Sequence, residues 1–376
     1  MDRSGLSGTV RPEKPYQQDH RVNIYYFANQ IYQLSYAWPL YTEIGGSFIV
    51  RKYKTLLKFQ RFLRGSSSFA GRSFTGAPTV QRRKLKYVSD LSGVILSQSN
   101  ARVRNDRAIS KSVFIGHGTG DKKYGGKAHT LETYEYLFVS GPKHMEKFKD
   151  SGLNFSEEKL VKIGNLRFDD YVNGKYTRNT LMSRMGIPKK DHARKTVLYA
   201  PTWEWGNGTL NRYAKLFCKE VTKEHNLIIR PHHFDSHKVP RLKLWAKLNG
   251  IERVYFSNSN RITKSDTMHD FQVSDILISD TSSVLYEYLI TGKPIIVANT
   301  DFSGLHSMPD SMNIMKIADL FQDSQSILDV VNRNLSSATD NSRHKKMLND
   351  CFYFNDGKSV QRAKEFVNRI AGELNQ

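Results

Sequence analysis

The sequence predicts an α/β protein whose parallel sheets are divided between two domains. Short apolar runs alternate with longer segments of helical period, which is the pattern of parallel β-α-β units. The chain has 376 residues, about twice the length of a typical single domain. Its hydrophobic and aromatic fractions, 39% and 11%, exclude a disordered chain. No stretch approaches the ~18 consecutive apolar residues of a membrane span.

Nine short runs have the length and composition of β-strands. Because open α/β sheets bind ligands beyond the carboxyl ends of their strands, the residues that follow these runs are the candidates for a functional site. The expected strands are residues 47–50, 93–96, 112–115 and 136–139 in the first half, and 196–199, 227–229, 253–256, 275–278 and 294–298 in the second.

Helical periodicity marks the segments between the strands. Residues 210–225, 284–291 and 359–373 are the clearest helices, and the last has a continuous apolar stripe. The polar and basic region 172–195 contains a Gly-Ile-Pro break and is the expected connection between the domains. We therefore expect an N-terminal domain of residues 1–180 and a C-terminal domain of residues 181–376.

The beginning of the chain and its cysteines indicate an intracellular protein. The first residues lack the apolar segment of a secretory signal. The two cysteines, Cys218 and Cys351, form no CxxC pair, so a disulfide scaffold is excluded and a zinc site gains no support.

Positive charge is concentrated in the first half of the chain. The formal net charge is +21, and residues 1–190 hold 33 basic and 15 acidic side chains, whereas residues 191–376 hold 24 and 21. Residues 44–89 contain eleven basic side chains and no acidic one. Such a field attracts an anionic partner, either a nucleic acid, an acidic membrane or a phosphate-rich polymer. A solvated face that only aids solubility is the alternative.

Residues 51–64 predict a basic amphipathic helix. Its basic residues fall along one face and its apolar residues along another, which suits a membrane interface. A helix packed on the core with a wet basic side is the alternative. The residues expected to contact a membrane or an acceptor are Arg51, Lys54, Lys58, Arg61 and Arg64.

Polar clusters follow several of the expected strands. After the strand at 112–115 comes a glycine-flanked His117, with Thr119 and Lys122 close behind. Glycines let backbone N–H groups approach a phosphate, and a histidine has a suitable pKa for a general base. A histidine at a strand end is also often structural.

Two further clusters lie in the second half. Arg230 and His232 follow the strand at 227–229 and together suit a phosphate clamp with an acid or a hydrogen-bond donor; pairing of Arg230 with a carboxylate is the alternative. Residues 279–283, Ser-Asp-Thr-Ser-Ser, enter the helix at 284–291. They suit a phosphate cradle, or simple N-capping. Glu287 suits a ribose hydroxyl or solvent.

The order of these motifs resembles that of the CDP-glycerol glycerophosphotransferase family, which comprises teichoic-acid primases and polymerases and their capsule-forming relatives. The resemblance covers roughly residues 112–300. Its motifs are HGT at 117–119, Gly-x-x-Arg-x-Asp at 164–169, APTW at 200–203, RPH at 230–232, SDxSS at 279–283 and KPI at 293–295. Three positions depart from the family pattern: Gly120-Asp121-Lys122 stands for Pro-Leu-Lys, Asn165-Leu166 for Tyr-Pro, and Thr281 for Tyr.

The resemblance implies a GT-B architecture, in which two Rossmann-like lobes face each other across a cleft that holds the active site. In that architecture the domain of residues 1–180 meets the acceptor or a membrane, and the domain of residues 181–376 binds the nucleotide donor. It implies that His117 is the catalytic histidine and His232 a second essential one. The other residues expected to bind the donor or its phosphates are Gly118, Thr119, Lys122, Arg167, Thr202, Arg230, Ser279, Asp280, Thr281, Ser282, Ser283 and Glu287.

The expected activity is therefore transfer of glycerol phosphate, or a similar polyol phosphate, from a CDP-activated donor to a hydroxyl of a lipid-linked or polymeric cell-envelope acceptor, with release of CMP. No carboxylate cluster typical of a metal site stands out, so we expect no required metal or cofactor. The protein is expected in the cytoplasm, at the inner face of the membrane, without a nucleic-acid partner. The alternatives are a GT-B glycosyltransferase with a nucleotide-sugar donor, a nucleic-acid-binding protein and an inactive membrane scaffold.

Overall fold

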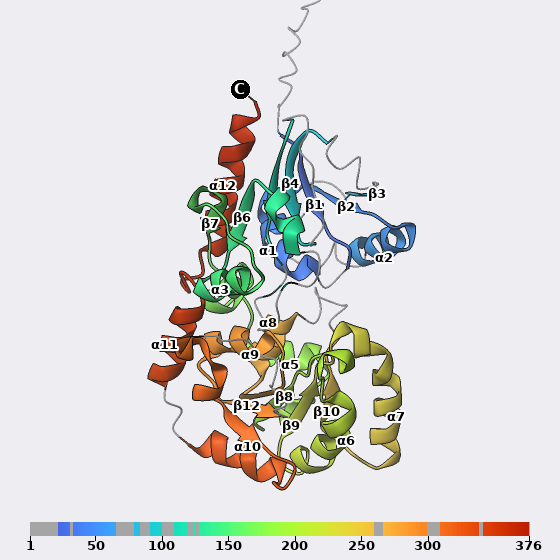
Figure 1. Ribbon diagram of the computed structural model, residues 1–376. Helices are drawn as coiled ribbons and strands as arrows, with labels where there is room; N and C mark the ends of the chain where they lie inside the picture. Colours follow the sequence, from blue (N-terminus) through green and yellow to red (C-terminus); the bar gives the residue numbers. More distant parts are fainter. Residues whose placement is uncertain are drawn as a thin grey trace, which may run out of the picture.

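The computed structural model shows two α/β lobes, one above the other in Figure 1. It describes residues 22–30, 33–64, 79–82, 91–99, 109–116, 118, 124, 128–258, 266–298, 309–337 and 341–375, without the side chains of residues 62–64, 79 and 341.

The first lobe is built on a parallel sheet in the order β3-β2-β1-β4-β5-β6-β7. Side chains alternate between its two faces, so that Tyr26 of the central strand lies opposite Phe48 and Leu96 in the same layer. Both faces are buried, which explains the nearly continuous apolar runs of the inner strands. The strands are Ile24–Phe27 (β1), Ser47–Val50 (β2), Thr79–Arg82 (β3), Gly93–Ser97 (β4), Ser110–Phe114 (β5), Tyr136–Val139 (β6) and Leu160–Lys162 (β7).

Helices cover both faces of this sheet. Apolar residues of α1 (Leu34–Ile44), α2 (Tyr53–Arg64) and α12 (Ser359–Glu373) pack in one core with Tyr26, Phe48 and Leu96. On the other face, α3 (Pro142–Asp150) packs its Phe148 in a second core with Phe27 and Ile95.

The second lobe has a parallel sheet in the order β10-β9-β8-β11-β12-β13. One face packs against α6 (Leu210–Val221), α7 (Val239–Leu248) and α10 (Ile327–Ser336), and the other against α5 (Arg178–Arg184), α8 (Thr267–Val273), α9 (Val284–Glu287) and α11 (Asn341–Cys351). The strands are Thr196–Tyr199 (β8), Asn226–Ile229 (β9), Val254–Phe256 (β10), Ile276–Ser279 (β11), Ile295–Ala298 (β12) and Asp319–Phe321 (β13).

The expected fold class is confirmed, and each of the nine expected strands forms within two residues of its expected bounds. The sequence pattern does not indicate β1, β3, β7 or β13. The expected helices form as α2, α6, α12 and α9, whose single turn continues as a 3-10 helix to Thr291.

The region 172–195 is not an exposed connection. It contains α5, and Leu181, Met182 and Ile187 are buried in the core of the second lobe against α8. The expectation of a linker there is wrong, because Leu181, Met182 and Ile187 bury one side of an otherwise polar segment.

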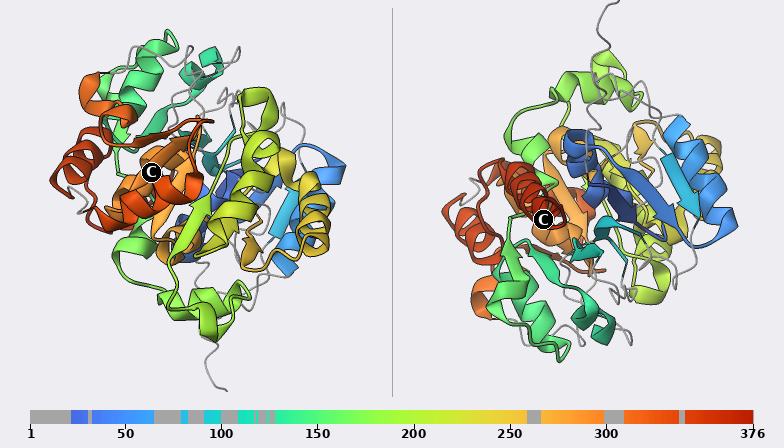
Figure 2. Two further views of the ribbon diagram at one scale, coloured as in Figure 1. Left: turned by 90° about the horizontal axis from the view of Figure 1, so that it is seen from below. Right: turned by 90° about the horizontal axis from the view of Figure 1, so that it is seen from above.

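Two segments connect the lobes. The chain first passes from β7 through α4 (Phe168–Val172) into the second lobe, and later returns to the first lobe through α12, seen end-on in Figure 2. Asp169 of α4 accepts hydrogen bonds from the backbone N–H groups of Ser359 (3.1 Å) and Val360 (2.7 Å). The division of the chain at residue 180 stays a prediction. The expected C-terminal domain of residues 181–376 included α12, which instead packs in the core of the first lobe.

Substitution of Gly141 by alanine is expected to destabilise the returning segment. A Cβ at Gly141 would lie 2.1 Å from the carbonyl oxygen of Cys351 and 2.3 Å from the Cα of Phe352, and both are backbone atoms that move only with the chain. We expect Gly141→Ala to lower the free energy of unfolding by about 2 kcal/mol, as for other overpacked sites. Gly372→Ala in α12 is the control, because no atom lies within 4 Å of its Cβ position. Equal unfolding midpoints for the two variants in urea would contradict this packing.

Candidate functional site at the junction of the lobes

The polar clusters of the second lobe come together at one edge of its sheet. Thr202, Arg230 and Ser283 follow β8, β9 and β11, and these strands are neighbours in the parallel sheet. Their carboxyl ends therefore share an edge. These three sequence motifs therefore lie along one edge of the sheet, and their use as a single site stays a prediction.

Asp280 is the structural centre of this edge. It is fully buried and accepts hydrogen bonds from the backbone N–H groups of Thr202 (2.8 Å), Thr209 (2.9 Å) and Thr281 (2.7 Å), and from the Thr209 hydroxyl (3.0 Å). Burial raises its pKa, and these donors act in the opposite direction. Both carboxylate oxygens thus hold the loop after β8 and the start of α6, which leaves donor binding by Asp280 a prediction with no support from this geometry.

The neighbouring hydroxyls divide into two groups. Ser279 donates to the carbonyl of Ala200 (2.6 Å) and Thr281 to the carbonyl of Gly206 (3.1 Å), so both brace the loop after β8. Ser282 and Ser283 are partly exposed at the start of α9, where Ser282 Oγ accepts a hydrogen bond from Val284 (3.4 Å). These last two serines are the ones in a position to meet a ligand.

Arg230 is paired with a carboxylate. Its guanidinium donates to Asp270 (2.8 Å) and to Ser257 (2.7 Å), and the Ser257 hydroxyl also donates to Asp270 (2.7 Å). All three side chains are buried, and burial raises the pKa of Asp270 to about 6 although Arg230 opposes it. The alternative expectation for Arg230 is confirmed, and its contact with a phosphate stays a prediction.

His232 lies at the surface of the edge among other rings. It is partly exposed, its ring centroid is 6.3 Å from that of Trp203, and its Nδ1 accepts a hydrogen bond from the backbone N–H of Phe234 (3.4 Å). The adjacent His233 is different, because burial lowers its pKa to about 4 despite the nearby Asp235. His232 is therefore the histidine of this pair that the fold presents at the edge.

The two lobes are joined by a buried charge cluster around Arg167. This side chain, expected at the donor phosphates, donates from Nη1 to Glu287 of α9 (2.7 Å) and to the Tyr36 hydroxyl of α1 (3.2 Å), and from Nη2 to Asp266 (3.2 Å) at the start of α8. The Tyr36 hydroxyl donates in turn to Glu287 (2.7 Å). Elements of both lobes thus share one hydrogen-bonded group.

The pKa shifts in this cluster follow from burial and from the opposite charges. Burial acts to lower the pKa of Arg167, but Asp266 and Glu287 outweigh it and raise the pKa. Burial acts to raise the pKa of Asp266, but Arg167, His269 and the backbone N–H of Met268 together outweigh it, so the pKa is lowered. Arg167 and Asp266 therefore carry opposite charges at neutral pH. Glu287 is 1% exposed and has partners on both oxygens, so its expected contact with a ribose finds no support.

Sequence reasoning missed Tyr36 and Asp266. Asp266 caps α8 by accepting the N–H of Met268 (2.8 Å), and an Asp before an apolar helical run is a recognisable capping signal. Nothing in the sequence around Tyr36 distinguishes it from the other 18 tyrosines.

Gly118 brings the first lobe to the serines of the second. A Cβ on Gly118, whose φ is +131°, would lie 3.2 Å from the Tyr36 hydroxyl and 3.5 Å from Ser283 Oγ. The HGT motif and the SDxSS motif therefore meet across the junction, at a glycine that permits both the backbone conformation and the close approach. His117, Thr119 and Lys122 lie outside the described residues.

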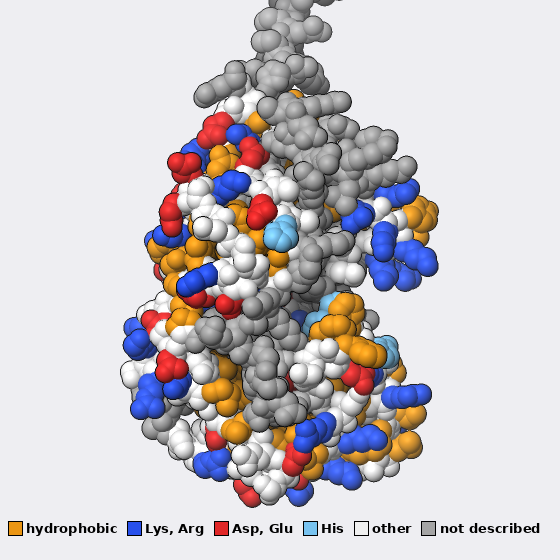
Figure 3. All heavy atoms as spheres, viewed as in Figure 1, with side chains coloured by type: hydrophobic (Ala, Val, Ile, Leu, Met, Phe, Trp, Pro, Cys, Tyr) orange, Lys and Arg blue, Asp and Glu red, His pale blue; other side chains and the backbone are white. Residues whose placement is uncertain are grey.

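The basic helix α2 lies away from this junction, on one side of the first lobe, where Figure 3 shows Lys and Arg side chains gathered. Its buried Phe59 packs in the core, whereas Arg51, Lys54, Lys58 and Arg61 are exposed. Tyr53 is also exposed (60%). The side chain of Arg64 lies outside the described residues.

Within the described part of the chain, no group of three or more His, Cys, Asp or Glu side chains has the arrangement of a metal site. Over the same residues, no helix combines the length and the apolar character needed to cross a bilayer.

Two Rossmann-like lobes with parallel sheets and a polar site at their junction define the GT-B class of fold. The chain belongs to the CDP-glycerol:poly(glycerophosphate) glycerophosphotransferase family, whose sequence model matches residues 65–369. The family expected from the motif order is thereby confirmed.

Individual relatives are distant. The chain is 24% identical over 283 residues to a teichoic acid poly(glycerol phosphate) polymerase of Staphylococcus epidermidis, an alignment that covers 72% of this chain and 36% of the polymerase. It is 23% identical over 291 residues to a teichoic acid glycerol-phosphate primase of Bacillus subtilis, covering 71% and 70%. The chain thus spans about a third of the polymerase and about two thirds of the primase.

The structure of the wall teichoic acid polymerase TagF has a similar fold. It matches with a TM-score of 0.66 and 16% sequence identity, over 94% of this chain and 90% of that chain. At 16% sequence identity, this similarity establishes the fold alone.

Replacement of Glu287 by glutamine is expected to destabilise the junction strongly. The change leaves the buried Arg167 with one carboxylate in place of two, and removal of one partner of a buried ion pair costs about 3 kcal/mol. Asp350→Asn is the matched control, because it breaks an exposed pair with Lys346 (2.8 Å) that is worth less than about 1 kcal/mol. Urea unfolding followed by circular dichroism measures both losses. A Glu287→Gln loss no larger than that of the control would contradict the role of this cluster.

Proposed function

We propose that the protein transfers glycerol phosphate, or a similar polyol phosphate, from a CDP-activated donor to a hydroxyl of a lipid-linked or polymeric cell-envelope acceptor of the teichoic-acid or capsule type. Membership of the family supports the donor. The observation that supports the proposal is the approach of Gly118 to Ser283, because Gly118 is the described residue of the HGT motif and Ser283 belongs to the SDxSS motif.

In the proposed reaction the acceptor oxygen attacks the phosphorus that carries the glycerol. A new P–O bond forms to the acceptor, the P–O bond to the CMP phosphate breaks, and CMP leaves with the bonding electrons. His117 takes the proton of the attacking hydroxyl. Ser282, Ser283 and His232 donate hydrogen bonds to phosphate oxygens. Arg230 and Arg167, each paired with carboxylates, hold the elements that present these groups. Positioning and charge neutralisation suffice for such a transfer.

A glycosyltransferase acting on a nucleotide sugar is the second candidate, because the GT-B fold alone is compatible with it. The motif order and the family match favour the CDP-polyol donor. For a nucleic-acid-binding role, the basic excess is the observation in favour, and the family match argues against it.

We also propose that the protein works at the anionic inner face of the membrane. α2 presents exposed basic residues and Tyr53, and α7 lies on the same side of the molecule (Figures 1 and 2). There Leu244 and Leu248 are exposed (58% and 77%) beside Arg241, Lys243 and Lys247. Exposed apolar side chains among basic ones are the composition of an interfacial surface.

Loss of either histidine is expected to reduce turnover without unfolding the protein. His117→Ala and His232→Ala should each lower the rate of CMP release from CDP-glycerol by about 10²-fold or more. His129→Ala is the control, since His129 is exposed and pairs with Glu132 at 3.7 Å. Near-normal turnover in either variant, with an unchanged circular dichroism spectrum, would remove that residue from the mechanism.

Charge reversal in α2 is expected to weaken membrane binding. The triple change of Lys54, Lys58 and Arg61 to Glu removes three attractive charges, each worth about 1 kcal/mol near an anionic surface, and adds three repulsive ones. We expect at least tenfold weaker sedimentation with vesicles rich in phosphatidylglycerol. The matched control reverses the exposed Arg343, Lys345 and Lys346 of α11, on the other side of the molecule. If both triple variants bind equally well, α2 is not the contact surface.

A further inference from the structure

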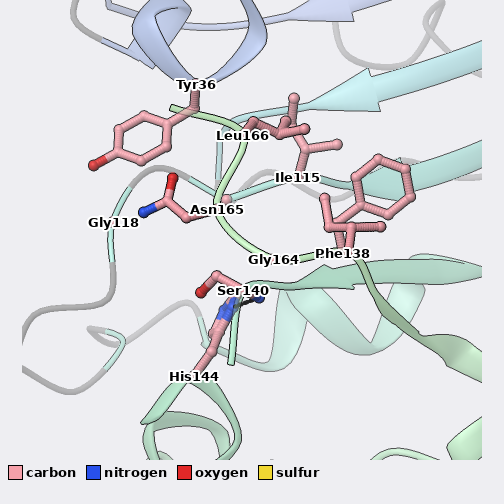
Figure 4. Close-up of a pocket in the computed structure, with 11 residues that line it drawn as sticks. Tyr36, Ile115, Gly118, Phe138, Ser140, His144, Gly164, Asn165 and Leu166 are labelled. Carbon is pink, nitrogen blue, oxygen red and sulfur yellow. Dashed lines mark hydrogen bonds between the residues drawn. The ribbon is translucent and has the colours of Figure 1, made fainter. Parts of the chain in front are cut away.

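The first lobe contains a small pocket beside the junction. It has a volume of about 30 Å³ and lies at the carboxyl ends of β5, β6 and β7 (Figure 4). One wall is apolar and the other carries polar groups; we refer to it as the N-lobe pocket. Its lining is formed by Tyr36, Ile115, Gly116, Gly118, Phe138, Ser140, His144, Ile163, Gly164, Asn165 and Leu166.

Asn165 presents a hydrogen-bond donor to this pocket. Its Oδ1 accepts the backbone N–H of Arg167 (3.1 Å), which fixes the orientation of the amide. Its Nδ2 then faces the other way, toward the side of Gly118 and the Tyr36 hydroxyl in Figure 4. The side chain is only 6% exposed, and no described residue accepts a hydrogen bond from Nδ2. A buried amide with an unused donor indicates a ligand.

Ser140 supplies a second group of the same kind. Its Oγ is buried and has no hydrogen-bond partner among the described residues. Its backbone is fixed, because the N–H donates to His144 Nδ1 (3.5 Å) and the carbonyl accepts from Tyr353 (2.9 Å). A buried hydroxyl without a partner costs free energy, so replacement of Ser140 by alanine should not destabilise the folded protein.

The size and polarity of the pocket indicate its ligand. One water-sized group needs about 10–15 Å³ of such space, so the pocket accommodates about two, the carbon and oxygen of a hydroxymethyl group. The apolar side chains of Ile115, Phe138 and Leu166 suit the carbon. Asn165 Nδ2 donates a hydrogen bond to the oxygen, and Ser140 Oγ accepts a hydrogen bond from the same hydroxyl group. An anionic group is disfavoured in this space, because no Lys or Arg side chain is among the described residues that line the pocket.

We propose that the N-lobe pocket binds the terminal hydroxymethyl group of the polyol acceptor, with Asn165 and Ser140 as its specificity-determining residues. The pocket is lined in part by Gly118, which approaches Ser283 of the second lobe. This inference rests on the proposed function, which supplies the acceptor hydroxyl. The distinction it makes is between acceptors that end in CH₂OH and those that do not.

The test measures binding of two probes by calorimetry in the absence of any donor. One is octyl glycerol phosphate, which ends in CH₂OH, and the other is the analogue with a terminal CH₃ in its place. We expect the wild-type chain to bind the hydroxymethyl probe about tenfold more tightly, as for a hydroxyl with two hydrogen bonds. Asn165→Asp keeps the acceptor for Arg167 and removes the donor, and Ser140→Ala removes the hydroxyl. Each should abolish the discrimination.

Asn368→Asp, at an exposed position of α12, is the control and should discriminate like the wild type. Equal binding of the two probes by the wild type, or full discrimination by both pocket variants, would overturn the proposal. Transfer from CDP-glycerol to the hydroxymethyl probe is measured in parallel. A chain that discriminates the probes but transfers nothing refutes the proposed function and leaves the pocket assignment in place.

Discussion

The buried guanidinium of Arg167 is the interaction on which the rest of the site depends. A desolvated positive charge between two lobes is tolerated only with opposite charges in contact, and here Glu287 and Asp266 of the second lobe supply them. Tyr36 completes the group from the first lobe. Since these partners come from separate elements, the charge fixes the junction at which Gly118 approaches Ser283.

Polar side chains at the junction have two separate uses. Asp280 and Arg230 are buried with internal partners, so they hold the loops that form the edge of the second sheet. His232 and Ser283 are partly exposed at that edge, and Asn165 directs its side-chain amide into the N-lobe pocket. The first group gives the site its shape, and the second is the group that we propose to meet the ligands. A motif in the sequence contains both kinds without distinguishing them.

The sequence predicts the fold better than the site. Buried parallel strands are recognisable in a sequence as short apolar runs. β3, β7 and β13 are instead short strands at the edges of their sheets, and they carry polar residues such as Lys162 and Asp319. β1 is an inner strand that was missed although its run of Ile24–Phe27 is apolar and follows Asn23. Glu287 shows why the site is harder to predict than the fold. Its motif is recognisable, but its partner Arg167 is 120 residues away in the sequence, and only the tertiary fold brings the two side chains together.

The positive charge of +21 belongs mainly to the lobe that we assign to the acceptor, and we assign the donor to the other lobe. The identity of the released nucleotide tests this account most directly. Incubation of the purified chain with CDP-glycerol, CDP-ribitol, CMP-sugars and UDP-sugars, each with an acceptor, should yield CMP from a CDP-polyol and no UDP. Release of UDP or CMP from a nucleotide sugar, with both CDP-polyols intact, would contradict it.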